Sequence, residues 1–195
     1  MQNRVGPFPK LSVLILLMLT STCAWSLELK TVLENAAVTP PSRVGFLEQR
    51  HNQLLKEPIK LTGYLEYLKV GQLRKVIETP FEEAFLITED YIEIERDGKT
   101  RRLSFGKSKS IRAMLGGIEA ILAGQVDRLS SLFRYELSGT SSCWSLRLEP
   151  LSPKVSAHLT AMLVKGDEDS ANSIRLELKD GEWSLMEFLN TDSEP

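Results

Sequence analysis

IKLTGYLEYLKVGQLRKVIETPFEEAFLITEDYIEIERDGKTRRLSF, residues 59–105, is the stretch that decides the fold. Turn residues divide it into short runs of mostly apolar or alternating sequence. Asp97-Gly98 is the strongest divider, because a two-residue hairpin turn needs positive φ at both positions. Strands this short and closely spaced pair with their neighbours in sequence, so the stretch predicts an antiparallel meander. The predicted strands are 59–68, 73–79, 83–88, 91–96 and 99–105.

The first of these strands alternates in a way that predicts a curved sheet. Leu61, Leu65 and Tyr67 fall on one face, together with Gly63. A glycine inside a strand favours a bend or a close approach by another backbone segment. Such a bend fits a sheet that rolls towards a barrel.

The rest of the chain predicts helices and further strands. Residues 27–37 predict an amphipathic helix, which Pro40-Pro41 ends. Apolar residues at helical spacing predict a second helix over 108–123 and a shorter one over 126–132. Gly116-Gly117 in the second helix costs stability, so it favours a kink or a close approach by another element. The remaining predicted strands are 43–50, 133–138, 143–149, 158–165, 173–179 and 183–189, about eleven in all.

The N-terminus predicts an export signal. Arg4 and Lys10 are followed by an apolar run, residues 11–19, that is short for a membrane span. Small residues in Ala24-Trp25-Ser26 predict cleavage after Ser26, with an uncleaved anchor as the alternative. We therefore expect a signal peptide over 1–26, a periplasmic location, and a single domain over 27–195.

Charge and cysteine content exclude some classes of protein. The net charge of −2 becomes −4 without residues 1–26, which carry two positive charges, so we expect no nucleic-acid partner. Removal of Cys23 leaves Cys143 alone, so no intramolecular disulfide is expected. Cys143 lies in a strand-like run, CWSLRLE, which predicts a small buried side chain.

Motifs for catalysis or metal binding are absent from the sequence. His51 and His158 are the only histidines, and neither belongs to a metal-ligand motif. The chain has no nucleophile elbow, phosphate-binding loop or dinucleotide fingerprint. We therefore predict that the protein is not an enzyme and has no metal or cofactor.

The helix over 108–123 leaves two interpretations open. It can fill the open side of the curved sheet as permanent core, or act as a lid over an apolar cavity. Periodicity alone favours permanent core, since an apolar stripe on a helix is usually core.

Several short motifs carry a resemblance to a known family. They are Phe46-x-Glu48-x-Arg50, Gly63-x-Leu65, Leu73-Arg74 with Pro80, Leu122-Ala123-Gly124 and Trp144-x-Leu146-x-Leu148-x-Pro150. In this order, after an amphipathic helix, they resemble LolA, the periplasmic carrier of outer-membrane lipoproteins, and in particular its divergent relatives. One departure is at Lys69-Val70, where LolA has an Arg-Pro pair. In LolA that arginine takes part in closed-lid hydrogen bonding and release. A lysine lacks the planar fork of donors, so the resemblance does not imply the same hydrogen bonds for Lys69.

The resemblance implies a fold, a function and a site. The fold is mainly β with α, an unclosed antiparallel β-barrel under a helical lid, and the function is to carry acyl chains in an apolar cavity. Implied partners are an acylated lipoprotein or other lipid cargo, an inner-membrane donor complex and an outer-membrane acceptor, with the protein a monomer. A lipid-binding or sensor module that does not transport is the alternative. The implied ligand-binding residues are Phe46, Leu65, Tyr67, Lys69, Leu73, Phe85 and Leu86 in the cavity, with Ile111, Leu115, Ile118 and Leu122 in the lid.

Overall fold

The computed structural model describes residues 27–104 and 109–189. Strands of these residues form one antiparallel, 11-stranded sheet in the order β6-β5-β4-β3-β2-β1-β11-β10-β9-β8-β7. The sheet does not close, because β6 and β7 are its two edges. The elements are α1 Leu29–Asn35, β1 Ser42–His51, β2 Ile59–Lys69, β3 Gln72–Thr79, β4 Glu83–Thr88, β5 Tyr91–Arg96, β6 Lys99–Ser104, α2 Lys109–Leu122, α3 Val126–Leu132, β7 Phe133–Thr140, β8 Cys143–Pro150, α4 Pro153–Ser156, β9 Leu159–Asp167, β10 Ser170–Leu178 and β11 Trp183–Phe188.

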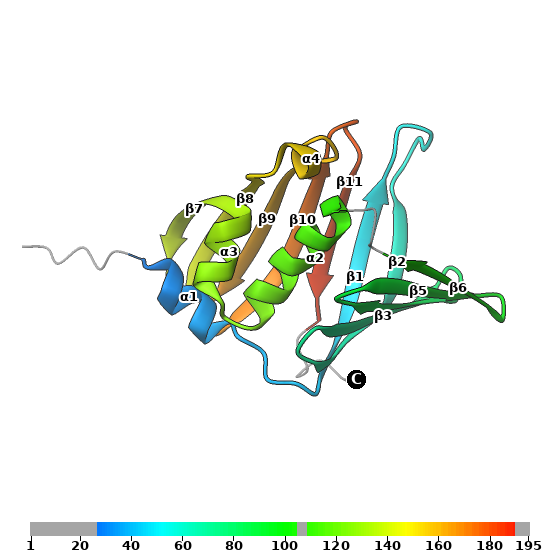
Figure 1. Cartoon of the computed structure of the whole chain (residues 1–195), viewed down its shortest axis with the longest axis horizontal. Coiled ribbons are helices and arrows are strands. Elements are labelled where there is room, and N and C mark those ends of the chain that lie inside the picture. The colour runs from blue at the N-terminus through cyan, green and yellow to red at the C-terminus, as the bar shows by residue number, and fades with distance from the viewer. Residues whose placement is uncertain (1–26, 105–108, 190–195) are drawn as a thin grey trace, which may run out of the picture.

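Helices cover one face of one half of this sheet. Figure 1 shows α1, α2, α3 and α4 over the half formed by β7 to β11, with α2 running obliquely across it towards β1. The other half, β2 to β6, is the predicted meander, in which each strand pairs with the next in sequence. This arrangement confirms the predicted fold class of an unclosed, curved antiparallel sheet with covering helices.

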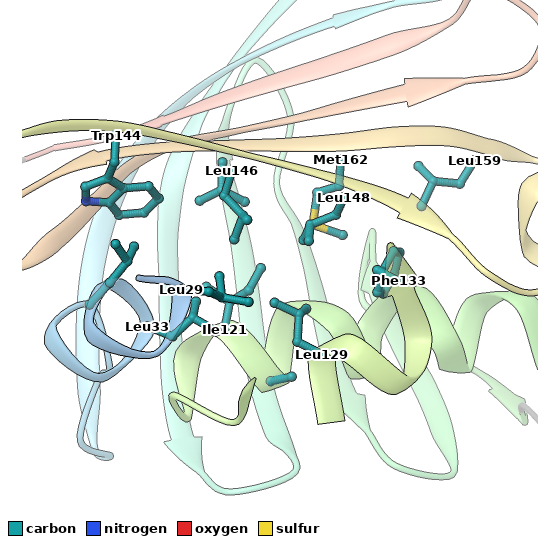
Figure 2. Close-up of a cluster of buried hydrophobic side chains, with 14 of the residues drawn as sticks. Leu29, Leu33, Ile121, Leu129, Phe133, Trp144, Leu146, Leu148, Leu159 and Met162 are labelled. Carbon is teal, nitrogen blue, oxygen red and sulfur yellow. The ribbon is translucent and has the colours of Figure 1, made fainter. Parts of the chain in front are cut away.

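The main hydrophobic core lies between these helices and the sheet. Figure 2 shows Leu33 and Ile121 on the helix side facing Trp144 and Leu146 on the sheet side. All four are at most 2% exposed. Full burial of such side chains stabilises the fold by roughly 1.5–3 kcal/mol each. The helices that carry them are therefore part of the folded core at this end of the sheet.

A second, smaller core lies under β1 to β3. It consists of Phe46, Leu61 and Ile77, all at most 1% exposed. Gly63 sits between them, where a Cβ atom would lie 1.9 Å from the carbonyl oxygen of Val76. The register of β2 on β3 shifts at the same point. The predicted close approach of backbone at Gly63 is thus confirmed.

Glycines also set the position of α2. A Cβ on Gly117 would lie 2.4 Å from the Phe133 ring, so this glycine lets the start of β7 pack closely against the helix. Gly124, at φ +65°, ends the helix in a Schellman motif. In that motif the N–H of Gln125 donates to Ala120 and the N–H of Gly124 donates to Ile121. Both the close approach and the predicted helix end are confirmed.

The predicted Asp97-Gly98 hairpin turn is confirmed, whereas a short helix and the exposure of Cys143 differ from the predictions. Asp97 and Gly98 have φ values of 52° and 67° and join β5 to β6 as a two-residue hairpin. The short helix α4 was not predicted. Cys143 is exposed rather than buried, because the alternation of β8 turns Trp144 inward and Cys143 outward. The predicted signal peptide lies outside the described residues.

Candidate ligand-binding groove

Two adjacent pockets lie between α2 and the sheet, and together they are here called the groove. The larger, here called the apolar pocket, has a volume of about 490 Å³. The smaller, here called the side pocket, has a volume of about 250 Å³ and lies towards the turns before β3 and after β4. Tyr67, Leu73, Ile118 and Leu122 line both pockets, so the two share a wall.

Strand alternation and helix periodicity bring the lining residues together. Tyr67 pairs with Leu73 across β2 and β3, so both side chains lie on the same face of the sheet. Ile118 and Leu122 are four residues apart in α2 and share one face of the helix. Phe188 and Ile174 contribute from β11 and β10 on the far side. An apolar surface is thus built from segments far apart in sequence.

The structure brings six of the implied ligand-binding residues into the groove. They are Leu65, Tyr67, Leu73, Leu115, Ile118 and Leu122. The other five lie elsewhere or cannot be placed. The side chain of Ile111 lies outside the described side chains, although its backbone belongs to α2.

Four of the implied residues lie outside the lining of the groove. Phe46 is completely buried in the second core, and Phe85 packs against that core. Leu86 pairs with Arg74 on the opposite face of the sheet, because one residue along a strand reverses the side-chain direction. Lys69 is exposed at the end of β2. None of these four side chains lines either pocket.

Sequence reasoning missed other lining residues. Ile174 and Phe188 belong to the last strands, and Phe188 faces Phe46 across the β1–β11 ladder. No local signal pairs the first strand with the last. Ile121 lay on the predicted apolar stripe of the helix, but it was not assigned to the cavity. It lines the apolar pocket at its edge while being only 2% exposed.

Polar atoms are buried in the wall of the side pocket. Arg128 Nη2 donates a hydrogen bond to Glu119 Oε2 at 2.7 Å. The other oxygen of Glu119, Oε1, and the hydroxyl of Tyr67 are shielded from solvent and have no hydrogen-bond partner among the described residues. Burial, and then the negative charge of Glu119, raise the pKa of Tyr67, with Arg128 acting in the opposite direction. The phenol is therefore neutral at pH 7 and able to donate.

A second polar cluster lies on the same sheet face but outside both pockets. Glu48 is 3% exposed and accepts hydrogen bonds from Lys75, from Ser184 Oγ at 2.6 Å and from Arg50 Nη2 at 3.1 Å. Burial alone would raise the pKa of Glu48, but Lys75, Ser184 and Arg50 together hold it below its ordinary value. Burial lowers the pKa of Lys75, and Glu48 opposes that change. The cluster joins β1, β3 and β11 and has its polar groups satisfied, which fits a structural role.

A metal site and a membrane-spanning helix are two other possibilities for residues 27–104 and 109–189. No group of three or more His, Cys, Asp or Glu side chains lies close enough to hold a metal ion there. No helix in this part of the chain is long and apolar enough to cross a membrane.

The fold and groove define a class of protein, an open antiparallel sheet with helices across an apolar groove. A family described as "Outer membrane lipoprotein carrier protein LolA-like" matches residues 21–186. This match spans most of the chain, so the chain belongs to the LolA-like family. A search of curated proteins gave no match.

The chain is also similar, at low sequence identity, to several solved structures. A LolA superfamily protein from Nitrosomonas europaea is 12% identical, with a TM-score of 0.44, and the match covers 85% of this chain and 93% of that one. The lipoprotein LppX of Mycobacterium tuberculosis is 8% identical, with a TM-score of 0.41 and coverage of 86% and 96%. A chain of the MucA/MucB complex of Pseudomonas aeruginosa is 11% identical, with a TM-score of 0.43 and coverage of 83% and 56%.

Proposed function

We propose that this protein is a periplasmic carrier that binds the acyl chains of a lipoprotein or another lipid and transfers them towards the outer membrane. The observation that carries the proposal is the apolar pocket between α2 and the sheet. Its volume of about 490 Å³ falls in the range of roughly 300–1,000 Å³ that small-molecule sites occupy. Membership of the LolA-like family and the predicted export signal support the location and the cargo.

Acyl-chain burial supplies enough free energy for such a role. Each methylene group moved from water to an apolar surface contributes about 0.8 kcal/mol, so ten would contribute roughly 8 kcal/mol. Association itself costs several kcal/mol in lost translational and rotational freedom. The net affinity is then moderate, which suits a carrier that must also release its cargo. No catalytic group is needed for this exchange.

The anchoring of α2 favours a second candidate, a binding module that keeps its ligand. Ala120 and Ile121 are buried in the main core, and the N–H of Val38 donates to the carbonyl of Leu122 at 2.8 Å. The C-terminal half of α2 is therefore held in place. In a carrier, only the N-terminal half of the helix is free to open the groove.

A two-step assay separates the two candidates. The purified mature chain is first titrated with a fluorescent fatty acid, and then the loaded protein is mixed with acceptor vesicles. A carrier takes up the fatty acid and delivers it to the vesicles faster than spontaneous desorption. Uptake without accelerated delivery supports the binding module. Absence of uptake contradicts both.

A further inference from the structure

The side pocket differs chemically from the apolar pocket beside it. Tyr67 forms part of the wall common to both, and its side chain is buried, with the residue only 4% exposed. Its hydroxyl and Glu119 Oε1 are the two polar atoms there without a hydrogen-bond partner among the described residues. Buried polar groups in folded proteins are generally paired, so two such atoms in one pocket wall point to a ligand group that pairs them.

The two atoms together specify the kind of group. A carboxylate oxygen can only accept a hydrogen bond, whereas a phenol can donate or accept one. Glu119 Oε1 therefore requires a ligand donor, an O–H or N–H. The Tyr67 hydroxyl can donate to a neighbouring ligand oxygen, such as an ester or amide carbonyl. Both requirements are met by a hydroxylated ester or an amide at the head of an acyl chain.

Charge in the side pocket argues against an anionic head. Three carboxylates and two guanidinium groups line it: Glu89, Asp90, Glu119, Arg112 and Arg128. One of the two guanidinium groups, that of Arg128, already binds Glu119. A phosphate or carboxylate placed here would be repelled more than attracted.

We propose that the side pocket selects an uncharged polar head that carries a hydrogen-bond donor, while the attached acyl chain occupies the apolar pocket. This inference rests on the proposed function, since it assumes that the acyl chain enters the groove. The ligand reaches the two buried atoms when the N-terminal half of α2, which contributes Arg112 and Leu115 to the lining, moves aside. Monoacylglycerols, diacylglycerols and N-acylated amines belong to the favoured class. Free fatty acids and phosphorylated lipids do not.

A displacement assay with ligands that share one chain tests the proposal. The hydrocarbon probe diphenylhexatriene, which has no head group, reports on the apolar pocket alone. It is displaced with monoolein, methyl oleate, oleate and oleoyl lysophosphatidic acid. Monoolein is expected to displace it at about tenfold lower concentration than the other three, as one well-made buried hydrogen bond would give.

Conservative variants assign the preference to the two side chains. Glu119→Gln is expected to reduce the preference for monoolein over methyl oleate to about twofold, because only monoolein carries the hydroxyl donor. Tyr67→Phe removes the donor to the ester carbonyl that both ligands carry, so both are expected to displace the probe only at about tenfold higher concentration. The preference is a ratio within one variant, so it does not depend on how strongly the probe binds. Tyr64→Phe is the matched control, because Tyr64 lies on the opposite face of the sheet, under the Arg43 guanidinium group. It should keep the wild-type ratio.

Each outcome has a definite meaning. Probe uptake with a monoolein preference that is lost in Glu119→Gln, together with weaker displacement by both esters in Tyr67→Phe, supports the proposal. Probe uptake with equal displacement by all four ligands, an unchanged preference in Glu119→Gln, or unchanged displacement by both esters in Tyr67→Phe overturns it and leaves acyl-chain binding intact. Failure of the wild-type protein to take up any probe overturns the proposed function and this inference with it.

Discussion

Ile118→Asp is the substitution that most directly separates a ligand-lined groove from a filled core. Ile118 lines both pockets and is partly buried, while Ile121, three residues later, is 2% exposed in the main core. Loss of the partly buried isoleucine surface removes roughly 1 kcal/mol of contact with a bound acyl chain. Covering a carboxylate with that chain costs at least another 2 kcal/mol. The total of about 3 kcal/mol corresponds to roughly 100-fold weaker binding.

The assay is a fluorescent fatty-acid titration, with urea unfolding measured on the same samples. Ile118→Asp should bind about 100-fold more weakly while losing only ~1–2 kcal/mol of stability, since the carboxylate can reach solvent through the groove. Leu47→Asp is the matched control. Leu47 is 45% exposed on the opposite face of the sheet, so its variant should bind as the wild type does. Ile121→Asp should instead prevent folding, because it buries an unpaired charge. A folded Ile118→Asp variant with wild-type affinity would refute the placement of the ligand.

Three further predictions concern the framework around the groove. Lys75→Met should lower the free energy of unfolding by roughly 3 kcal/mol in urea titrations, because it removes a partner from the buried Glu48. An unchanged free energy of unfolding would show that the Lys75–Glu48 ion pair is dispensable for stability. Because the pKa of Glu48 is lowered in the folded protein, its ionised form should stabilise the fold above about pH 4.3, the ordinary pKa of a glutamate. This contribution to the free energy of unfolding should be lost as the pH falls through the folded-state pKa. Urea titrations at several pH values should show a weaker pH dependence in Glu48→Gln. Gly117→Ala should lower the melting temperature, because its Cβ would lie 2.4 Å from the Phe133 ring. Alanine favours the helical conformation more than glycine does, so a higher melting temperature would contradict the close packing of Phe133 against Gly117.

Much of the fold could be predicted because its signals are local. The two positive-φ residues of the Asp97-Gly98 turn specify a hairpin by themselves. Gly63 and Gly117 were expected to allow close approach, and each does so. These features depend on a few neighbouring residues, so the sequence alone carries them.

The site was predicted less completely because its geometry depends on long-range pairing. Strand alternation correctly placed Leu65 and Tyr67 on one face, but it could not show that Phe46 lies in the second core instead of in the groove. The contributions of Ile174 and Phe188 follow from the pairing of β1 with β11, the first and last strands of the described residues. No local pattern encodes that contact.

The buried polar atoms were missed for a related reason. Tyr67 was expected in the cavity wall as an aromatic surface, and Glu119 lies in the otherwise uncharged second half of the helix, residues 116–122. The approach of α2 to β2 brings these two side chains to one pocket. A charged residue inside an apolar helical stripe is the one sequence signal that could have suggested it.

Native mass spectrometry of the mature protein, purified from a bacterial periplasm without detergent, tests the central claim most directly. The account predicts a population of protein carrying a lipid adduct that dissociates on collisional activation, and the loss of that adduct in Ile118→Asp but not in Leu47→Asp. The claim that the groove under α2 binds acyl chains would be contradicted by a wild-type protein that is detected only at the mass of the polypeptide without an adduct and that takes up no fluorescent fatty acid.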